Sequence, residues 1–559
     1  MKKHLLILFV ALAGMLVSAP AEWLPIEARL QWAEWFGATN YTLPPESITT
    51  AQYSSETPCP EDLPGWRKAQ NIDGVSIRAS QTCSPDNPYT VATSVLGTNR
   101  VSATTLKKSG LTPDAVVKGR DLDGDGDPDE IHIRLEVVEL NGGSPEMQVP
   151  TTQFSIAPGI KPGLWVFAPK SLGMATENFE SNKARSLLRL PAPVIRVEQG
   201  DRIKITLENT HYMPHTIHFH GVDHAFLDEN GEGNDGVPLT SEVPVMPGFA
   251  RTYDLNPRHA GTMYYHCHVQ PQVHIMMGLQ GMFVVEENRP NNFVQTLNIG
   301  AGHVRAPSQA IKEIFDREYD LHYQDIDIDL SNLIQKFNDA RLITEHMHRR
   351  YNTSQAVSDF YTLNGRSFPY TFRESLIVTK PNENIKLRVA NGGSHGIALH
   401  THGHKTTLTH ADGVPVPENA RITRDVFWIA SSQRADLMLN TSNDGLHSYG
   451  DGVWLLHDHE EKGITNNGIG PGGNIGAIVY ESFLREDGWP LTFGNSYEQY
   501  FSAEYYRRQL PVWHSYSKGF FDEAGEDHFY VIRVLAYWFF LGITLIQLVY
   551  LVKLKSRNT

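Results

Sequence analysis

Cysteine is scarce in this 559-residue chain, which contains only three. Cys59 and Cys83 lie close together in a Pro- and Ser-rich region and could pair in an oxidising compartment, which leaves Cys267 over. Positive charge is also in short supply, because 48 Lys and Arg stand against 63 Asp and Glu, for a net charge of −15. This balance argues against a nucleic-acid partner and fits a body that accepts cationic or neutral small substrates.

Long apolar runs are confined to the two ends of the chain. Residues 1–21 combine a basic start, an apolar stretch and small residues near Ala21, which is typical of a secretory signal peptide. Val534 to Val552 is a run of 19 residues without a formal charge. It predicts a transmembrane helix over residues 531–552, and the basic residues that follow predict a cytoplasmic tail at 553–559. We therefore expect an exported body, anchored in the cytoplasmic membrane on its outer (periplasmic or extracytoplasmic) side; a buried helix is the alternative.

The body of the chain contains an internal repeat. "VIRVEQGDRIKITLENT" (194–210) and "LIVTKPNENIKLRVANGG" (376–393) both read as an apolar strand, a polar turn and an alternating strand. "MPGFARTYDLN" and "ASSQRADLMLN" then recur at nearly the same offset. This pattern predicts two homologous β-sandwich domains, at residues 151–300 and 356–500, in an all-β protein. The other segments are an N-terminal β-rich accessory region (22–150), a linker with a helical insertion (301–355) and a juxtamembrane segment (501–530).

The accessory region contains an acidic loop, "DLDGDGDPDEIHIRLEV". Asp121, Asp123, Asp125 and Asp129 occupy positions 1, 3, 5 and 9, with glycines at the bends. Hard oxygen ligands at this spacing suit calcium, although His132 replaces the position-12 glutamate of an EF-hand. We predict a structural calcium site resembling the short calcium loops of integrin-type β-repeats; a solvated acidic turn is the alternative.

Four H-x-H pairs, two in each repeat, dominate the chemistry of the sequence. They are His218 with His220, His266 with His268, His400 with His402, and His457 with His459. On a β-strand, side chains i and i+2 point to the same face, so each pair presents two imidazoles to one metal cluster. Imidazole-rich sites without carboxylates suit copper or zinc.

Cys267 indicates which of these two metals, copper or zinc, the sequence favours. A blue-copper centre needs one thiolate, two imidazoles and a weak axial ligand. The first repeat offers Cys267, His215 and His274, whereas the second repeat has Ile397, Asp458 and no later histidine at the corresponding places. A complete ligand set in one repeat, entirely missing from the other, indicates that Cys267 is a copper ligand rather than a buried free thiol.

"HTIHFHG", "HCH", "HTHGH" and "HDH" resemble the four histidine motifs of the multicopper oxidases, the laccase and ceruloplasmin superfamily. "DGVPLT" and "FWIASSQRADLML" are also similar to that family, and the resemblance covers residues 150–500. It implies two cupredoxin-like Greek-key sandwiches and four coppers per active unit. A mononuclear centre in the first of two domains resembles the two-domain class, for which a homotrimer with clusters formed between subunits is expected.

The resemblance also implies a role for each residue that matches a motif. His218 and His400 match the type 2 copper ligands. The type 3 pair would be held by His220, His266, His268, His402, His457 and His459. Type 1 copper would be held by His215, Cys267 and His274.

One place departs from the family pattern. The second type 1 histidine usually lies five residues after the cysteine, where this chain has Gln272, and His274 comes two residues later. We take His274, because imidazole is the better copper ligand and an insertion restores the pattern at "GLQGMFVV". Leu279 is then the non-coordinating axial neighbour, and Met277 is the competing axial residue.

These assignments predict an oxidase that takes one electron at a time near His274 and reduces dioxygen to water at the cluster. Cys267 is bonded through the backbone to both His266 and His268, which would connect the two centres covalently. Asp223 and either Asp458 or Glu460 are candidate proton relays, and a carboxylate that orients an imidazole is the alternative for each.

The electron donor stays open among phenols, Fe(II), Mn(II), Cu(I) and a redox protein. A copper nitrite reductase is the first alternative function, but its catalytic copper needs only three histidines. The second is a copper-binding or electron-carrying protein without turnover, which has no use for the eight paired histidines.

Overall fold

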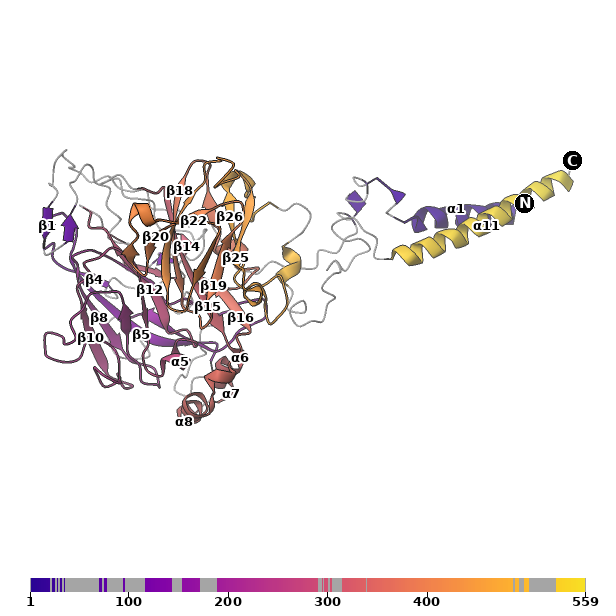
Figure 1. Cartoon of the computed structure of the whole chain (residues 1–559). Helices are drawn as coiled ribbons and strands as arrows, with labels where there is room; N and C mark the ends of the chain where they lie inside the picture. Colours follow the sequence, from indigo (N-terminus) through magenta and orange to yellow (C-terminus); the bar gives the residue numbers. More distant parts are fainter. Residues whose placement is uncertain are drawn as a thin grey trace. The chain divides into compact units, whose positions relative to one another are not determined.

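The computed structural model of the chain divides into two compact units, Met1–Glu46 with Thr492–Thr559, and Ser47–Leu491 (Figure 1). The residues it describes are 2–20, parts of 23–35, 70–72, 75–77, 94–95, 116–142, 153–170, 189–289, 294, 296–299, 302–303, 314–337, 339–485, 488–491, 497–501 and 529–557. Cys59 and Cys83 lie outside these residues, so their pairing stays a prediction. So does most of the juxtamembrane segment at 501–530.

The first unit contains two helices, α1 (Lys2–Ser18) and α11 (Tyr530–Arg557). They contact each other, with His4 Nδ1 lying 3.0 Å from Gln547 Oε1. In the described part of the chain, Tyr530–Ser556 is the one helix long and apolar enough to cross a membrane. Its large apolar side chains, such as Leu535 and Ile546, are mostly exposed. This exposure is unlike that of a core helix in a soluble protein.

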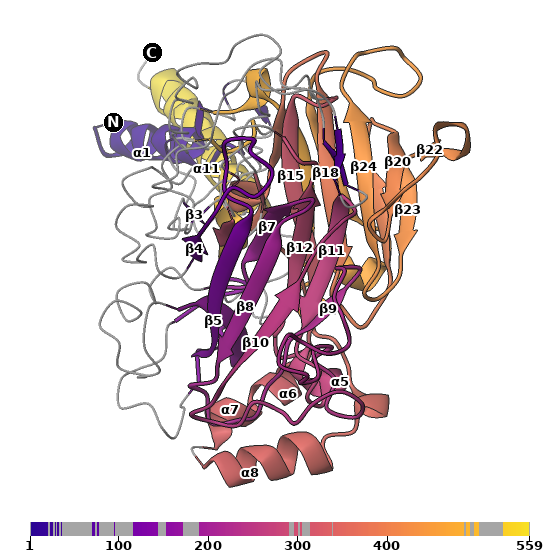
Figure 2. The same ribbon diagram turned by 90° about the vertical axis from the view of Figure 1, so that its left-hand side faces the viewer.

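The first sandwich packs two sheets face to face (Figure 2). One sheet has the order β10 (Ala250–Leu255), β8 (Arg202–Glu208), β5 (Glu130–Leu140), β4 (Val116–Lys118), with β6 (Leu164–Pro169) also paired to β5. The other has the order β3 (Ser94–Val95), β13 (Leu297–Ile299), β7 (Val194–Glu198), β12 (Gln280–Glu286), β11 (Gly261–His266), β9 (His218–His220). Ile205 and Phe283 bury their side chains between the sheets, whereas Arg202 and Lys204 on β8 are exposed.

The second sandwich repeats this arrangement. Its larger sheet has the order β14 (Gly302–His303), β15 (Arg317–Ile326), β18 (Asn384–Asn391), β24 (Arg434–Asn440), β20 (Thr406–Ala411), β21 (Val414–Pro415), with β16 (Phe360–Leu363) on β15 and β22 (Thr423–Arg424) on β20. Its smaller sheet has the order β17 (Ile377–Thr379), β26 (Gly476–Tyr480), β25 (Val453–Asp458), β19 (Ile397–Thr401), β23 (Val426–Ile429). The prediction of an all-β protein with a C-terminal helix is confirmed.

Short elements complete the described residues. They are β1 (Gln70–Ile72), β2 (Val75–Ile77), α5 (Pro271–His274), η6 (Thr353–Gln355), α9 (Thr371–Glu374), η7 (Glu418–Ala420), η8 (Glu461–Ile464), η9 (Glu481–Phe483) and η10 (Glu498–Phe501).

Both sandwiches begin earlier in the chain than the sequence predicted. β4 and β5 fall in the expected accessory region at 22–150, yet β5 runs parallel to β8 inside the first sandwich. β15 falls in the expected linker at 301–355, yet it runs parallel to β18 inside the second. The boundaries expected at residues 150 and 355 are therefore wrong. Each strand pairs with a partner about 70 residues further along the chain, which local patterning does not reveal.

The expected helical insertion is present between β15 and β16. It consists of α6 (Ile328–Ser331), α7 (Leu333–Lys336), α8 (Ala340–Thr344) and the π-helical η5 (Glu345–Arg350). Asp327 and Asp339 cap the starts of α6 and α8 by accepting backbone hydrogen bonds. Ile334, Ile343 and Met347 are fully buried in the core of the first sandwich. The insertion therefore covers the end of that sandwich where α5 lies (Figure 2).

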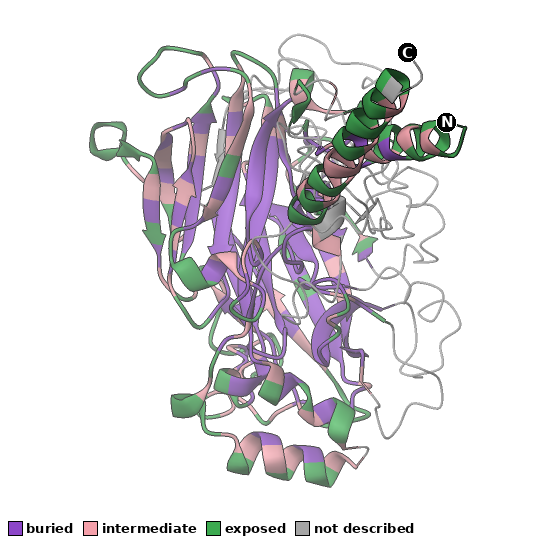
Figure 3. Cartoon of the chain, turned by 90° about the vertical axis from the view of Figure 1, so that its right-hand side faces the viewer, coloured by how far each residue is buried: buried purple, intermediate pink, exposed green. Residues whose placement is uncertain are grey.

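A buried ionic network joins the two sandwiches. The Arg196 guanidinium on β7 donates to both carboxylate oxygens of Asp320 on β15, at 2.6 and 2.7 Å, and to Glu286 at 3.1 Å. Arg388 on β18 donates to the Thr262 hydroxyl on β11 at 3.1 Å. All of these side chains are buried, in line with the buried strands that surround them (Figure 3). The bidentate Arg196 pair therefore fixes how β7 and β15 lie against each other.

We expect Arg196→Met to destabilise the chain by about 3–5 kcal/mol, because it leaves the Asp320 carboxylate buried without its bidentate cation. Lys204→Met is the control, since Lys204 and its partner Glu229 are exposed, and it should cost less than about 1 kcal/mol. Urea unfolding of the two variants measures the difference. Equal losses would mean that Arg196 contributes no more than a surface ion pair.

Candidate metal centres

The four histidine pairs meet two by two at the ends of paired strands. In the first sandwich, His218 on β9 lies opposite His266 on β11. In the second, His400 on β19 lies opposite His457 on β25. The first histidine of one pair thus faces the first histidine of the other in both sandwiches. The repeat inferred from the sequence therefore extends to the strand register.

The first group of imidazoles gathers four rings. His220 Nε2 lies 2.9 Å from His266 Nε2, and ligand atoms of His218, His220 and His266 all lie within 4.8 Å of one another. The His268 ring centroid is 5.3 Å from that of His218. Four nitrogen donors thus converge on one surface of the first sandwich.

The second group is its counterpart. His402 Nε2 lies 3.0 Å from His457 Nε2, and His400, His402 and His457 meet the same 4.8 Å limit. The His459 ring centroid is 5.6 Å from that of His400. Among the described residues, no candidate metal cluster combines histidines from both sandwiches. Each sandwich therefore presents its own group of four imidazoles, and we call these two groups the first and second half-site.

Backbone carbonyls orient the rings in both groups. The four Nδ1-to-carbonyl distances are His218 to Asp235, 2.6 Å; His266 to Cys267, 2.9 Å; His400 to Asp425, 3.1 Å; and His457 to Asp458, 2.9 Å. A carbonyl only accepts, so each of these Nδ1 atoms carries the proton. The lone pair is left on Nε2, which is the atom that faces the other imidazoles and is available to a metal.

Burial keeps the imidazoles neutral. Together with the charge of His218, burial lowers the pKa of His220 to about 4. Burial also lowers the pKa of His266 to about 3. At neutral pH these rings are therefore uncharged, with a free lone pair on one nitrogen, which is the form that binds a metal.

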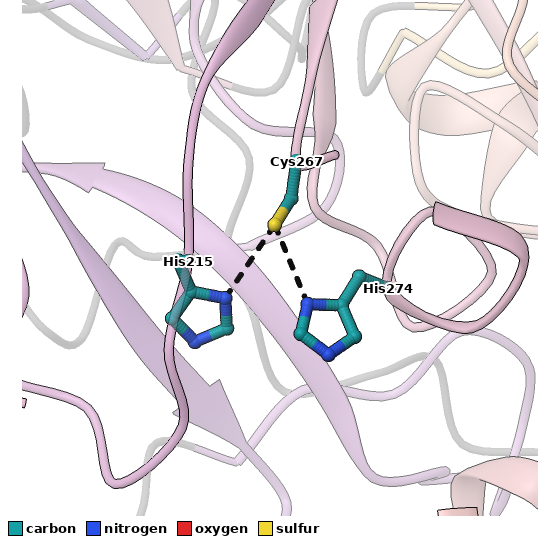
Figure 4. Close-up of side chains that lie close together, drawn as sticks. All are labelled: His215, Cys267 and His274. Atoms are coloured by element: carbon teal, nitrogen blue, oxygen red, sulfur yellow. Dashed lines mark hydrogen bonds between the residues drawn. The ribbon is translucent and has the colours of Figure 1, made fainter. Parts of the chain in front are cut away.

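A separate, fully buried group lies deeper in the first sandwich (Figure 4). Cys267 Sγ is 3.6 Å from His215 Nδ1 and 3.3 Å from His274 Nδ1. Burial lowers the pKa of both imidazoles well below the usual range and raises the pKa of the thiol to about 12. Both rings therefore stay neutral and direct their Nδ1 atoms at the sulfur. A metal bound here would have to displace the thiol proton.

The helix α5 places His274 and Gln272 on opposite sides. Its four residues run from Pro271 to His274 and turn His274 inward, toward Cys267. Gln272 is on the outer side, where its amide donates to Gln270 at 2.8 Å. Leu279 and Met277 are both fully buried, and the Leu279 carbonyl accepts the Cys267 N–H at 3.0 Å.

Residues 188–290 match the multicopper oxidase family model. That stretch includes the Cys267 group and all four histidines of the first half-site. The chain resembles the multicopper oxidases over this stretch. It is 25% identical over 289 residues to the iron transport multicopper oxidase FET3 of Saccharomyces cerevisiae, covering 49% of this chain and 37% of that protein. It is 26% identical over 270 residues to Laccase-2 of Thanatephorus cucumeris, covering 46% of this chain and 39% of that one.

The match is partial in length. The chain spans less than two fifths of the length of these two relatives. Among solved structures, it is 24% identical to a blue copper oxidase from Nitrosomonas europaea, with a TM-score of 0.47, covering 69% of this chain and 95% of that one.

The second sandwich has no counterpart of the Cys267 group among the described residues. Ile397 is buried at the start of β19. Asp458 takes the place of the cysteine, and its Oδ1 accepts the Ala398 N–H at 2.8 Å and the Glu460 N–H at 3.0 Å. Burial raises the pKa of Asp458. The carboxylate thus organises the backbone around the second half-site.

The predicted proton relays occupy different surroundings. Asp223 accepts from the Arg258 N–H at 2.8 Å and lies 3.6 Å from His259. Burial alone would raise the pKa of Asp223, but the hydrogen bonds from Arg258 lower it. Glu460 is exposed beside the second half-site. Asp223 is therefore paired with Arg258. Asp458, in contrast, lies between His457 and His459 and accepts backbone N–H groups beside them.

Two carboxylates that the sequence did not predict lie beside His218 and His400, the first histidines of their pairs. Asp235 Oδ1 is 3.3 Å from His218 Nδ1, and Asp425 Oδ2 is 4.0 Å from His400 Nδ1. Asp235 also lies 3.2 Å from His224. They lie 17 and 25 residues after their histidines, so no common spacing pointed to them.

The side chains that surround His215 and His274 were also not predicted from the sequence. His211 Nδ1 lies 2.9 Å from His215 Nε2, and His348 Nε2 lies 3.0 Å from His274 Nε2. Trp165 stands edge-on to both inner rings, with centroids 5.9 Å from His215 and 5.1 Å from His274. Each inner imidazole is thus held on its outer nitrogen by another histidine.

The acidic loop at 121–129 adopts a compact form. Oxygen atoms of Asp121, Asp123 and Asp129 lie within 4.8 Å of one another. Asp121 accepts the backbone N–H groups of Gly124 at 2.6 Å and Gly126 at 2.9 Å. Asp125 is fully buried. Burial and the charges of Asp123 and Asp121 raise the pKa of Asp129 to about 6.

Proposed function

We propose that this multicopper oxidase couples one-electron oxidation of a donor to the four-electron reduction of dioxygen to water. The observation that supports this function best is the bonding around Cys267. Its side chain lies in the buried site with His215 and His274, while its peptide bonds lead to His266 and His268 of the surface site. Two candidate metal sites are therefore linked by a few covalent bonds.

The donor sets fit copper. One thiolate with two imidazole Nδ1 atoms in a dry pocket suits a type 1 copper, held by His215, Cys267 and His274. His218 and His400 would hold type 2 copper. His220, His266, His268, His402, His457 and His459 would hold the type 3 pair. Leu279 would be the axial neighbour of type 1 copper, with Met277 as the competitor. Four coppers would supply the four electrons that dioxygen needs.

The protein's own residues orient these ligands and handle protons. The carbonyls of Asp235 and Asp425 hold the Nδ1 protons of His218 and His400 and keep Nε2 free. Asp458, whose pKa burial raises, is the stronger candidate for passing protons to the cluster. Glu460 is its exposed neighbour. Asp223 is the weaker candidate, because Arg258 holds its carboxylate.

The complete cluster would form between subunits, as in a two-domain oxidase that closes into a homotrimer. Each half-site is bordered by exposed apolar side chains: Leu239 and Val243 follow Asp235, and Ile422 and Trp428 flank Asp425. Exposed apolar side chains beside a half-complete metal site favour a face that a second copy of this chain covers.

The reducing donor is a phenol or a metal ion such as Fe(II). One relative's name refers to iron transport and another is a laccase. Cu(I) has less support, because Met276, Met277 and Met282 are buried in the core and offer no sulfur at the surface. The acidic stretch 226–236 partly stabilises its own turn, since Asp228 accepts the Asn230 and Glu232 N–H groups at 2.9 Å. This leaves Mn(II) and a redox protein as further donors to assay.

The proposed location is outside the cytoplasmic membrane. α1 would act as the export signal and α11 as the anchor, with Lys553, Lys555 and Arg557 on the cytoplasmic side.

Cys267→Ser tests the oxidase function. Serine cannot supply the thiolate, so we expect loss of the copper–thiolate absorption band and a fall of about a hundredfold or more in donor-driven oxygen uptake. Copper bound by the other eight histidines should remain. Copper counting, spectroscopy and oxygen uptake check this. Unchanged oxygen uptake would overturn the proposal, nitrite consumption without oxygen uptake would favour a nitrite reductase, and a single bound copper without turnover would favour a carrier.

Mixing two inactive variants tests assembly between subunits. His220→Ala damages only the first half-site and His402→Ala only the second. In co-refolded mixed trimers, an intact first half-site meets an intact second one at about a quarter of the interfaces, so about a quarter of the oxygen uptake should return. Either variant mixed with itself is the control. No recovery in mixtures proven to be mixed would mean that the cluster forms within one chain.

We also propose that the loop at 121–129 binds calcium together with Asp201. Asp201, in the turn between β7 and β8, is buried, and its Oδ1 has no hydrogen-bond partner in the described structure. Burial and the charges of Asp129 and Asp125 raise the pKa of Asp201 well above its usual range. Several carboxylates crowded together favour a bound divalent ion.

Calcium should therefore stabilise the chain, by about 2.7 kcal/mol at a hundredfold excess over Kd. Thermal unfolding in calcium and in EGTA measures the effect, and magnesium, which demands a tighter octahedral site, should not reproduce it. Asp201→Asn should reduce the response. Identical unfolding in calcium and EGTA would leave the loop as a solvated acidic turn.

A further inference from the structure

The Cys267 group is closed to solvent on the side where a donor would be expected to reach it. His274 is fully buried. Its outer nitrogen, Nε2, meets His348 Nε2 at 3.0 Å, with ring centroids 5.1 Å apart. A donor outside the protein therefore cannot contact His274 itself.

His348 belongs to η5 of the helical insertion, and the first sandwich holds that insertion firmly. Ile343 and Met347 are fully buried in its core. The Thr344 hydroxyl donates to Met213 Sδ at 3.2 Å, and Met213 is two residues before His215 in the chain. π-Helical turns such as η5 recur at functional sites. His348 is thus fixed in place over His274.

The other inner imidazole has no comparable route outward. The outer nitrogen of His215 meets His211, which is itself buried. His211 Nε2 lies 4.0 Å from the buried carboxylate of Glu139. His348, by contrast, is only partly buried. Of the two histidines that touch the outer nitrogens of the Cys267 group, only His348 reaches solvent.

We propose that electrons enter this oxidase through His348, so that the donor binds on the helical insertion and contacts His348 rather than a copper ligand. This inference rests on the proposed function and names its electron-entry residue. In each event the donor would lose one electron, and a copper(II) ion held by His215, Cys267 and His274 would be the one-electron acceptor. A phenol also gives its hydroxyl proton to water and leaves as a phenoxyl radical.

The charges around His348 specify the class of donor. Arg349 is exposed and adjacent to His348. Glu345, the one carboxylate in the η5 sequence, pairs with Arg350. A hydrated metal cation would approach the positive charge of Arg349, and the one η5 carboxylate is already paired with Arg350, whereas a neutral or anionic phenol would not be repelled. The entry surface therefore favours a phenol over Fe(II).

The test is anaerobic stopped-flow reduction of the copper-loaded full chain, followed by the copper–thiolate band, with hydroquinone and Fe(II) as donors. His348→Phe keeps an aromatic ring but removes the hydrogen bond to His274. His348→Gln keeps a hydrogen-bonding group. His346→Phe is the matched control, because His346 lies on the same element but stacks on Phe337, with centroids 4.4 Å apart.

We expect His348→Phe to slow reduction by hydroquinone about tenfold or more and to shift the reduction potential of the site. Copper content and reoxidation by dioxygen should be unchanged. His348→Gln should restore part of the rate, and His346→Phe should match the unmodified chain. In that chain, hydroquinone should reduce the site faster than Fe(II).

Reduction of His348→Phe at the unmodified rate, or faster, would overturn the inference, because His348 would then only cover the site. Faster reduction by Fe(II) than by hydroquinone would overturn the donor class. Both results leave the oxidase function intact. A chain that bound no copper at Cys267 would instead overturn the proposed function and this inference together.

Discussion

The pairing of β9 with β11 is the constraint on which both candidate sites of the first sandwich depend. It sets His218 opposite His266 and so brings two H-x-H motifs, 48 residues apart, onto one surface. Because side chains alternate along an extended backbone, the residue after His266 must point the other way, into the core. That residue is Cys267. One strand end therefore serves a surface site and a buried site at once, and their separation is set by covalent geometry rather than by flexible side chains.

The second sandwich shows what the same register does without a cysteine. His400 lies opposite His457 just as His218 lies opposite His266, yet the residue between His457 and His459 is Asp458. Its carboxylate is buried and accepts two backbone N–H groups, so it stabilises the turn that presents the imidazoles. The duplicated fold thus keeps one surface half-site in each sandwich and retains the buried thiol site in only one. Asp458 occupies the buried position that Cys267 has in the first sandwich. A buried polar side chain needs hydrogen-bond partners, and these two N–H groups supply them.

Sequence patterns could predict the parts of this protein that depend on short-range geometry. The H-x-H pairs, the repeat and the apolar C-terminal helix follow from residue spacing along strands and a helix. The grouping of Cys267 with His215 and His274 was expected from the ligand types that a blue-copper centre needs and from the family resemblance. The strands β5 and β15 were assigned to the wrong segments, because their partners are remote and parallel pairing leaves no turn signal. His211, His348, Asp235 and Asp425 were missed for a related reason. Each meets its histidine through a hydrogen bond whose partners share no fixed spacing.

The helical insertion turns an otherwise open sandwich end into a closed one. Burying the two inner imidazoles lowers their pKa and keeps them neutral, but it also leaves their outer nitrogens needing partners in a dry environment. His211 and His348 meet that need. Of these two histidines, only His348 of the insertion is itself partly exposed. The six-residue π-helix η5 therefore both closes the site and connects it to the surface. The buried pairs Arg196–Asp320 and Arg388–Thr262 hold the two sandwiches together. Since the insertion leaves β15 and returns through β16 of the second sandwich, those pairs also fix where His348 meets His274.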